Sequence, residues 1–267
     1  MIICLRTAGR RWPVGNRSKD TQTLLNDYLK ELYLKSMRLS YEELAIQARQ
    51  DSLSYEQYLL ELAEQEYTAR RNNRIERNLK ESKIPLDKSI ENFDLKRVSG
   101  KVRQQVRLLQ EGHFTDQNEN ILAFGNPGSG KTHLLCAIGQ ELIRNGKRVY
   151  FSPCSLLVQD LLKAKQDLQL SRILNKLAKY DALIIDDIGY VQQDRSEMEV
   201  LFTLLADRYE RRSVMITSNL PFSKWEQIFK DPMVTAAAID RLVHHSVILE
   251  LNISSYRMEK AKEKKTV

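Results

Sequence analysis

The stretch that decides the fold covers residues 125 to 132 and reads Gly125, Asn126, Pro127, Gly128, Ser129, Gly130, Lys131 and Thr132. An apolar run at 121–124 precedes it, and a helical pattern at 133–138 follows it. A glycine-rich segment between a strand and a helix is typical of a phosphate-binding loop, because successive backbone N–H groups can then point at an anion. The pattern predicts a nucleotide site in which Lys131 contacts the β and γ phosphates and Thr132 binds Mg²⁺.

Around this loop, apolar runs alternate with helical patterns. The predicted strands cover 121–124, 148–152, 182–186, 214–217 and 247–251. Strands that are buried on both faces read as near-continuous apolar runs. Five such runs separated by helices therefore predict an α/β domain with a five-stranded parallel sheet between helices.

Two of the predicted strands end in polar residues. Asp186 and Asp187 end the strand at 182–186, and Asn219 follows the next strand. We expect Asp186 to belong to the magnesium shell, Asp187 to orient or deprotonate the attacking water, and Asn219 to hydrogen-bond that water and the γ phosphate. The alternative is that the two acids and the amide merely end their strands and cap loops.

The amino-terminal part of the chain has a helical pattern from residue 20 to residue 79. Two capping signatures, Ser40 with Glu43 and Ser54 with Gln57, predict that a new helix begins at each serine. Pro85 ends the helical pattern, because it lacks the N–H that a helix needs. We expect a flexible leader at 1–19, a small all-helical domain at 20–87, the α/β domain at 88–258 and a basic tail at 259–267.

The chain is basic, with 42 Lys and Arg against 35 Asp and Glu, a net charge of +7 and a pI of about 9.2. Nucleic acid is the first candidate for an anionic partner, and solubility alone is the alternative. Arg70, Arg74 and Arg77 share one face of a predicted helix. This basic ridge either contacts DNA phosphates or is an ordinary solvated face.

Composition and spacing exclude several other classes of protein. The three cysteines show no C-x-x-C spacing, so neither a disulfide scaffold nor a zinc finger is expected. The four histidines show no ligand spacing either, and no zinc site is expected. No apolar stretch reaches the ~18 residues of a membrane span, and no secretory signal is evident. We therefore expect a cytoplasmic protein without membrane association.

The order of the motifs resembles that of a known family. The glycine loop, Asp186 with Asp187, Asn219 and finally Arg241 resemble the AAA+ ATPases of the initiator and helicase-loader group, over about residues 88–258. The resemblance implies hydrolysis of ATP with Mg²⁺, and it implies that Arg241 is an arginine finger that reaches the ATP of the adjacent subunit. After Asn252 little sequence follows, so no C-terminal lid domain is expected.

The same resemblance assigns three further residues. Arg257 is expected to be the sensor-2 arginine facing its own ATP, Phe93 to lie beside the adenine, and His133 to lie near the phosphates. A surface ion pair is the alternative role for Arg241 and Arg257.

The amino-terminal unit is similar to that of the IstB-like transposition ATPases, through residues 70–74 and 83–94. This implies a homo-oligomeric ATPase that binds double-stranded DNA and assists a partner transposase in target capture. In this group a helical insert lines the DNA path, which suggests DNA contact for Lys163, Lys165 and Arg172; a solvated helix is the alternative. The rival functions are a DnaC-like helicase loader, a small-molecule kinase, and a scaffold that binds ATP without hydrolysing it.

Overall fold

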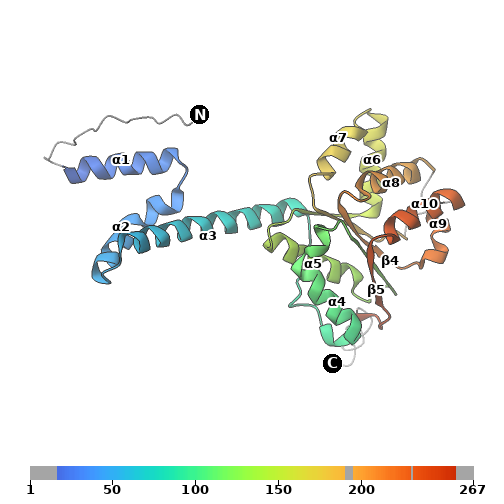
Figure 1. The fold of residues 1–267 in the computed structure, drawn as a ribbon. Helices are drawn as coiled ribbons and strands as arrows, with labels where there is room; N and C mark the ends of the chain where they lie inside the picture. Colours follow the sequence, from blue (N-terminus) through green and yellow to red (C-terminus); the bar gives the residue numbers. More distant parts are fainter. Residues whose placement is uncertain (1–16, 190–194, 230, 257–267) are drawn as a thin grey trace, which may run out of the picture. The chain divides into compact units, whose positions relative to one another are not determined.

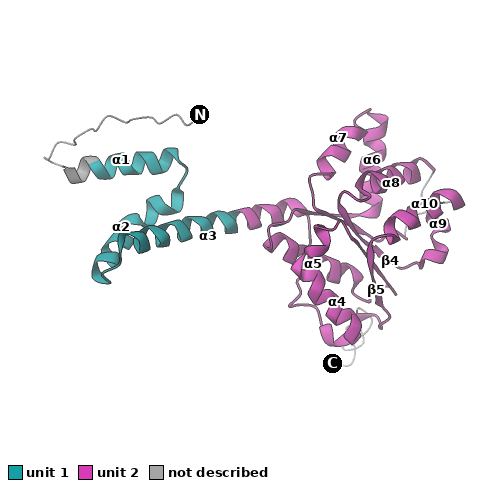
Figure 2. Cartoon of the chain, in the orientation of Figure 1, with its two compact units in different colours: residues 1–73 teal, residues 74–267 magenta. Residues whose placement is uncertain are grey.

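The computed structural model describes residues 17–189, 195–229 and 231–256 (Figure 1). The chain forms two compact units, residues 1–73 and residues 74–267 (Figure 2). Of the predicted leader, residues 17–19 belong to the first helix, and residues 1–16 lie outside the described residues, as does the predicted tail at 259–267. None of the described helices is long and apolar enough to cross a membrane.

The first unit is helical. It contains α1 (Arg17–Glu31), α2 (Lys35–Gln50) and the first part of α3 (Tyr55–Ser82). Its core is small and consists of Leu29, Tyr41, Leu44 and Leu62. A small core supplies little hydrophobic stabilisation, so polar contacts between the helices matter more here than in a large domain.

One of the two predicted capping signatures is confirmed. The Ser54 N–H donates to Gln57 Oε1 at 2.8 Å, and the Gln57 N–H donates to Ser54 Oγ at 3.2 Å, which forms a capping box at the start of α3. The start predicted at Ser40 is wrong, because Ser40 lies inside α2 and its hydroxyl donates to the Ser36 carbonyl.

The start of α2 is set instead by a residue of α3. Glu66 Oε2 accepts the backbone N–H groups of Ser36 at 2.7 Å and Met37 at 3.2 Å. Burial of the Glu66 carboxyl opposes ionisation, but the hydrogen bonds from Arg70 and from these two N–H groups outweigh it and lower its pKa. An anionic side chain from another helix therefore caps α2.

The second unit holds the predicted parallel sheet, which is confirmed. Its strands, in the spatial order β2-β3-β4-β1-β5, are all parallel. Their bounds are β1 (Asn120–Gly125), β2 (Val149–Pro153), β3 (Ala182–Asp186), β4 (Ser213–Ser218) and β5 (Ser246–Leu251). The register pairs Phe124 with Ser218 and Ile185 with Ile216, so β1, β3 and β4 end near one another at the carboxyl edge.

Helices cover both faces of this sheet (Figure 1). The core on one face contains Ile121, Ile184 and Met215, and the core on the other contains Leu122 and Leu183. The first face is covered by α4 (Gly100–Glu111) and α5 (Lys131–Arg144). The second is covered by α6 (Cys154–Gln166), α7 (Leu170–Leu177), α8 (Arg195–Arg208), α9 (Glu226–Phe229) and α10 (Pro232–Val243). Short 3₁₀ helices lie at Leu95–Arg97, His113–Thr115 and Phe222–Lys224.

The division between the units falls earlier than the boundary predicted at residue 87. Ile75 and Leu79, on the last turns of α3, pack against the core beneath α4 and α5. Ile84 is buried in the same core, and the Ser82 hydroxyl accepts its backbone N–H at 3.1 Å. The segment before Pro85 therefore packs with the second unit, although its helical pattern is continuous with that of the first.

Candidate nucleotide-binding site

The glycine loop between β1 and α5 has a backbone that only glycine suits at two positions. Gly128 has φ +80°, and a Cβ there would lie 2.1 Å from Ser255 Oγ. Gly130 has φ +94°, and a Cβ there would lie 2.8 Å from Phe93 Cε2. Both the dihedral angle and the neighbouring side chains therefore require the glycines, and the loop leads directly into the N-terminus of α5.

Lys131, the first residue of α5, is held against this loop. Its side chain is buried, and Nζ donates to the carbonyls of Gly125 at 2.8 Å and Asn126 at 3.0 Å. Both acceptors are main-chain carbonyls of the glycine loop, so the ammonium lies beside the loop backbone. A cation in this position complements the positive end of α5 in attracting an oligophosphate.

A cluster of oxygen atoms lies at the adjoining strand ends. Asp186 Oδ1 accepts the hydroxyl of Thr132 at 2.7 Å and the hydroxyl of Thr217 at 2.7 Å. The Thr217 oxygen in turn accepts the backbone N–H of Asp187 at 2.7 Å. Hydroxyl and carboxylate oxygens are the ligands that Mg²⁺ prefers. The structure thus brings together Thr132 and Asp186, the two residues that the sequence analysis expected to bind Mg²⁺.

Thr217 itself was not predicted as a site residue. It is almost completely buried near the end of β4, and its single hydroxyl contacts both the Asp186 carboxylate and the Asp187 backbone. The sequence did contain a sign of this role, because a hydroxyl follows the apolar run Val214, Met215 and Ile216. In a strand that is buried on both faces, a hydroxyl group is unfavourable unless it is hydrogen-bonded.

Asp187 occupies an unusual environment. Its φ is +64°, in the left-handed region that non-glycine residues rarely adopt. Burial raises the pKa of its carboxyl, the negative charge of Asp186 raises it further, and Lys131 partly opposes both. A carboxylate whose charged form is disfavoured accepts a proton more readily, which suits a general base.

Two buried polar atoms of predicted site residues have no hydrogen-bond partner among the described residues, namely Ser129 Oγ and Asn219 Oδ1. Ser129 belongs to the glycine loop and Asn219 follows β4. Buried polar atoms are nearly always paired, so orphaned atoms indicate that a polar ligand completes the site. Together with the loop, Lys131 and the oxygen cluster, they fit a magnesium-bound nucleotide.

A cavity of about 230 Å³ adjoins the loop. It is lined by Asp87, Lys88, Asn92, Phe93, Asp94, Arg97, Gly128, Ser129, Gly130, Lys131, Thr132, His133, Ile253 and Tyr256. The ring of Phe93 contacts His133 edge-on at a centroid distance of 5.3 Å, and His133 Nε2 lies 2.8 Å from the Ser89 carbonyl. Phe93 and His133 thus line the same cavity as the phosphate-binding loop.

The segment after β5 returns to the loop. The Tyr256 N–H donates to the Gly128 carbonyl at 3.0 Å, and Arg97 donates to the Ser254 carbonyl at 3.2 Å. The Arg97 guanidinium lies 5.1 Å from the centroid of the Tyr256 ring. Arg97 and Tyr256 were not predicted as site residues, because no local pattern links them to the loop. Arg257, the expected sensor-2 residue, lies outside the described residues.

Arg241 lies in the last turn of α10 and does not line this cavity. Its Nη1 donates to the Ala237 carbonyl at 2.9 Å, and its guanidinium lies 5.1 Å from the centroid of the Phe202 ring. The structure therefore does not bring Arg241 together with the glycine loop of its own chain.

The predicted DNA-contacting residues divide into two groups. Arg70 donates to Glu66 Oε1 and to the Tyr33 carbonyl, both at 2.7 Å, and so links helices within the first unit. Lys165 forms an ion pair with Glu199 at 2.7 Å. The remaining four side chains are exposed, namely those of Arg74, Arg77, Lys163 and Arg172.

The sheet order, the glycine loop between β1 and α5, and the acids at the end of β3 together define a P-loop domain of the AAA+ class. Solved structures agree on the fold. The DnaC helicase loader matches with a TM-score of 0.55 and 16% identity, over 63% of this chain and 98% of that chain. AMPPCP-bound DnaA from Aquifex aeolicus matches with a TM-score of 0.53 and 21% identity, over 69% and 56%.

The family described as IstB-like ATP binding protein matches residues 27–264, and this chain belongs to that family. The protein y4iQ/y4nD/y4sD of Sinorhizobium fredii, named as an insertion sequence ATP-binding protein, is 44% identical over 89% of this chain and 80% of its own length. A Pseudomonas aeruginosa protein named as an ATP-binding protein of insertion sequence IS21 is 38% identical, over 86% of this chain and 88% of its own length.

Proposed function

We propose that this chain is an ATP-hydrolysing, DNA-binding protein that assembles into oligomers and assists the transposase of an insertion sequence. The observation that carries the proposal is the oxygen cluster of Thr132, Asp186 and Thr217 beside the glycine loop. Family membership and the names of the relatives support the link to ATP and to insertion sequences.

In this proposal the glycine loop and Lys131 hold the triphosphate. Phe93 lies beside the base, and His133 lies near the phosphates. Thr132 and Asp186 hold Mg²⁺, which supplies positive charge to the phosphate oxygens when it is bound. The Thr217 hydroxyl keeps the Asp186 carboxylate turned toward Thr132.

Hydrolysis then depends on residues around the γ phosphate position. Asp187 accepts the proton of the attacking water, consistent with its raised pKa, and Asn219 orients that water through its otherwise unpaired Oδ1. Arg241 of a neighbouring copy stabilises the developing charge, a contribution of ~10³ to 10⁵ in rate in comparable enzymes.

DNA binding rests on exposed cations and requires no base-specific contact. Arg74, Arg77, Lys163 and Arg172 are exposed and free to meet phosphate groups in this proposal, with Arg70 and Lys165 adding positive charge beside them. If ATP favours the assembled state and DNA favours it too, each must raise the affinity for the other by linkage. The same assembled state is the form that meets the transposase.

The test is a steady-state ATPase assay with and without duplex DNA, combined with nucleotide binding. Lys131→Ala is expected to abolish nucleotide binding, whereas Asp187→Ala keeps binding and loses turnover. Arg241→Ala is expected to bind nucleotide normally and to lose DNA-stimulated turnover. Arg211→Ala, at an exposed arginine paired with Asp207, is the matched control and retains turnover. Full turnover by a dilute monomer without DNA contradicts the proposal.

A further inference from the structure

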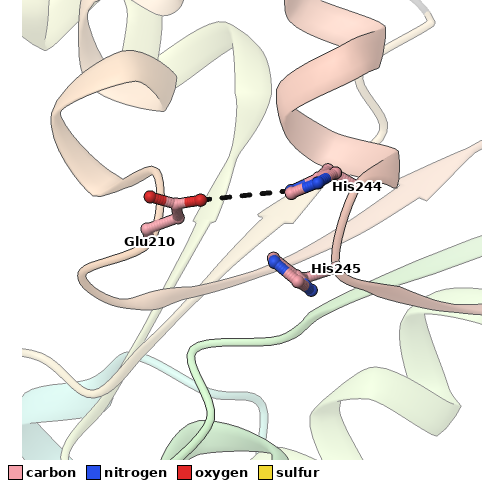
Figure 3. Close-up of side chains that lie close together, drawn as sticks. All are labelled: Glu210, His244 and His245. Atoms are coloured by element: carbon pink, nitrogen blue, oxygen red, sulfur yellow. Dashed lines mark ion pairs between the residues drawn. The ribbon is translucent and has the colours of Figure 1, made fainter.

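Two histidines and a glutamate converge away from the nucleotide cavity (Figure 3). Glu210 follows α8, His244 ends α10, and His245 leads into β5. One possible ligand atom from each residue lies within 4.8 Å of the other two, and His244 Nδ1 is 4.0 Å from Glu210 Oε1. None of the three lines the cavity beside the glycine loop.

The backbones of all three residues are held in place by hydrogen bonds. Asn118 Nδ2 donates to the Glu210 carbonyl at 3.0 Å, and the Asn120 N–H donates to the His245 carbonyl at 2.7 Å. The His244 N–H donates to the Asp240 carbonyl at 3.0 Å. The main chain is therefore pre-arranged, and exposed side chains need only rotate to change their separations.

Contacts with two neighbouring side chains also orient the His244 imidazole. The Tyr209 hydroxyl lies 3.2 Å from His244 Nδ1, and the His244 and His245 rings contact each other edge-on at a centroid distance of 4.2 Å. A hydrogen bond to a ring nitrogen fixes the orientation of an imidazole. Glu210 lies in the turn after α8 and has φ +57°, in the left-handed region.

We propose that Glu210, His244 and His245 bind Zn²⁺. Two imidazoles and one carboxylate are a donor set that suits zinc, with a fourth position left for water, whereas Mg²⁺ and Ca²⁺ prefer oxygen ligands. Zinc–nitrogen bonds of ~2.0 to 2.1 Å place tetrahedral ligand atoms ~3.3 Å apart. The present ligand atoms lie within 4.8 Å of one another, and all three residues are exposed, so rotation of their side chains can bring these atoms closer.

Bound zinc joins the turn after α8 to the C-terminal end of α10. Arg241 lies one turn before His244 on the same helix, so zinc stabilises the turn that positions this arginine. Sequence spacing did not reveal these three residues as a metal site, because the third ligand, Glu210, belongs to a different element from the two adjacent histidines. The binding site stands independently of the role proposed for Arg241.

The direct test is zinc binding to the full chain, freed of any polyhistidine tag, with MgADP present to occupy the glycine loop. Titration against a chromophoric chelator is expected to show one zinc per chain. His244→Ala, His245→Ala and Glu210→Gln are each expected to weaken binding at least ~10-fold, since loss of a ligand exceeds loss of a supporting hydrogen bond. His113→Ala is the matched control, because His113 is also exposed beside a glutamate, Glu111, and its loss is expected to leave zinc affinity unchanged.

A second measurement uses the unaltered protein and so does not depend on the variants folding. Zinc is expected to protect His244 and His245, but not His113, from diethyl pyrocarbonate, read by mass spectrometry of peptides. Equal protection of all three histidines, unprotected His244 and His245 at saturating zinc, or wild-type zinc affinity in a His244→Ala/His245→Ala variant overturns the proposal.

Discussion

Replacing Thr217 with valine tests the hydrogen-bond arrangement at the centre of the site. Valine has almost the same shape, so packing near the end of β4 is preserved while one hydroxyl is lost. That hydroxyl donates to Asp186 Oδ1 and accepts the Asp187 N–H, both at 2.7 Å. The substitution therefore leaves a backbone donor without its acceptor and removes one of the two hydroxyl donors to the Asp186 carboxylate.

The magnitude follows from these two bonds. A hydrogen bond to a charged group contributes ~1.5 to 3 kcal/mol, and an unsatisfied buried donor costs ~1 to 3 kcal/mol. The two effects overlap, so we expect Thr217→Val to lower the free energy of unfolding by about 3 kcal/mol. For a domain of this size that corresponds to a fall in Tm of roughly 6 to 12 °C.

Thermal and urea denaturation, together with magnesium-dependent nucleotide binding and turnover, measure the outcome. Turnover is expected to fall more than nucleotide affinity, because Lys131 and the glycine loop remain intact. Thr203→Val is the control, since its hydroxyl donates to the Glu199 carbonyl within α8, away from the Asp186 carboxylate. If Thr217→Val matches Thr203→Val in both stability and turnover, the inferred role of the Thr217 hydroxyl is wrong.

Three further substitutions test other features of the second unit. The pKa of Asp187 is raised in the folded state, so its negative charge lowers the stability of the protein above that pKa. Asp187→Asn is therefore expected to be more stable than the parent at pH 7, and the gain is expected to vanish as the pH falls toward ~4. Urea denaturation at both pH values measures the difference. Gly128→Ala places a side chain at φ +80° against Ser255 and is expected to lower the free energy of unfolding by ~1 to 3 kcal/mol. Gly100→Ala is the control, because open space surrounds Gly100, and it is expected to leave the melting temperature unchanged. Burial lowers the pKa of Arg208 only to about 10, so it stays charged while donating to four main-chain carbonyls. Arg208→Met is expected to lose ~3 to 5 kcal/mol, and a midpoint of chemical denaturation equal to that of the parent contradicts this role.

Local patterns predicted most of the sheet and the loop. All five strands were found from apolar runs. β1, β3 and β4 are buried on both faces, which gives near-continuous apolar sequence, whereas β5 alternates, with Leu249 and Leu251 buried and Ile248 and Glu250 exposed. Helix starts in the first unit were harder. Ser54 begins α3 through its own capping box, but α2 begins before Ser40 because Glu66, which lies in another helix, binds the N–H groups of Ser36 and Met37.

The boundary between the two units also depends on contacts that local sequence patterns do not show. The helical pattern runs to residue 79, and Pro85 was the break that the sequence offered between this pattern and the α/β domain. The contacts divide the chain after Asn73, because Ile75 and Leu79 pack beneath the sheet of the second unit. A periodic pattern reveals that a helix has an apolar face, but it does not reveal which core that face joins.

What the sequence determined by itself is the inventory of the site: a glycine loop before a helix, a lysine and threonine after it, two acids at the end of one strand and an amide at the end of another. These residues are recognisable because each belongs to a motif within a few positions along the chain. Only the tertiary structure decided which groups meet, such as the Thr217 hydroxyl with Asp186, the Tyr256 N–H with the Gly128 carbonyl, and Glu210 with His244. Hydrogen bonds and metal bonds act over ~2 to 3 Å in space, and sequence spacing does not encode that distance between separate elements.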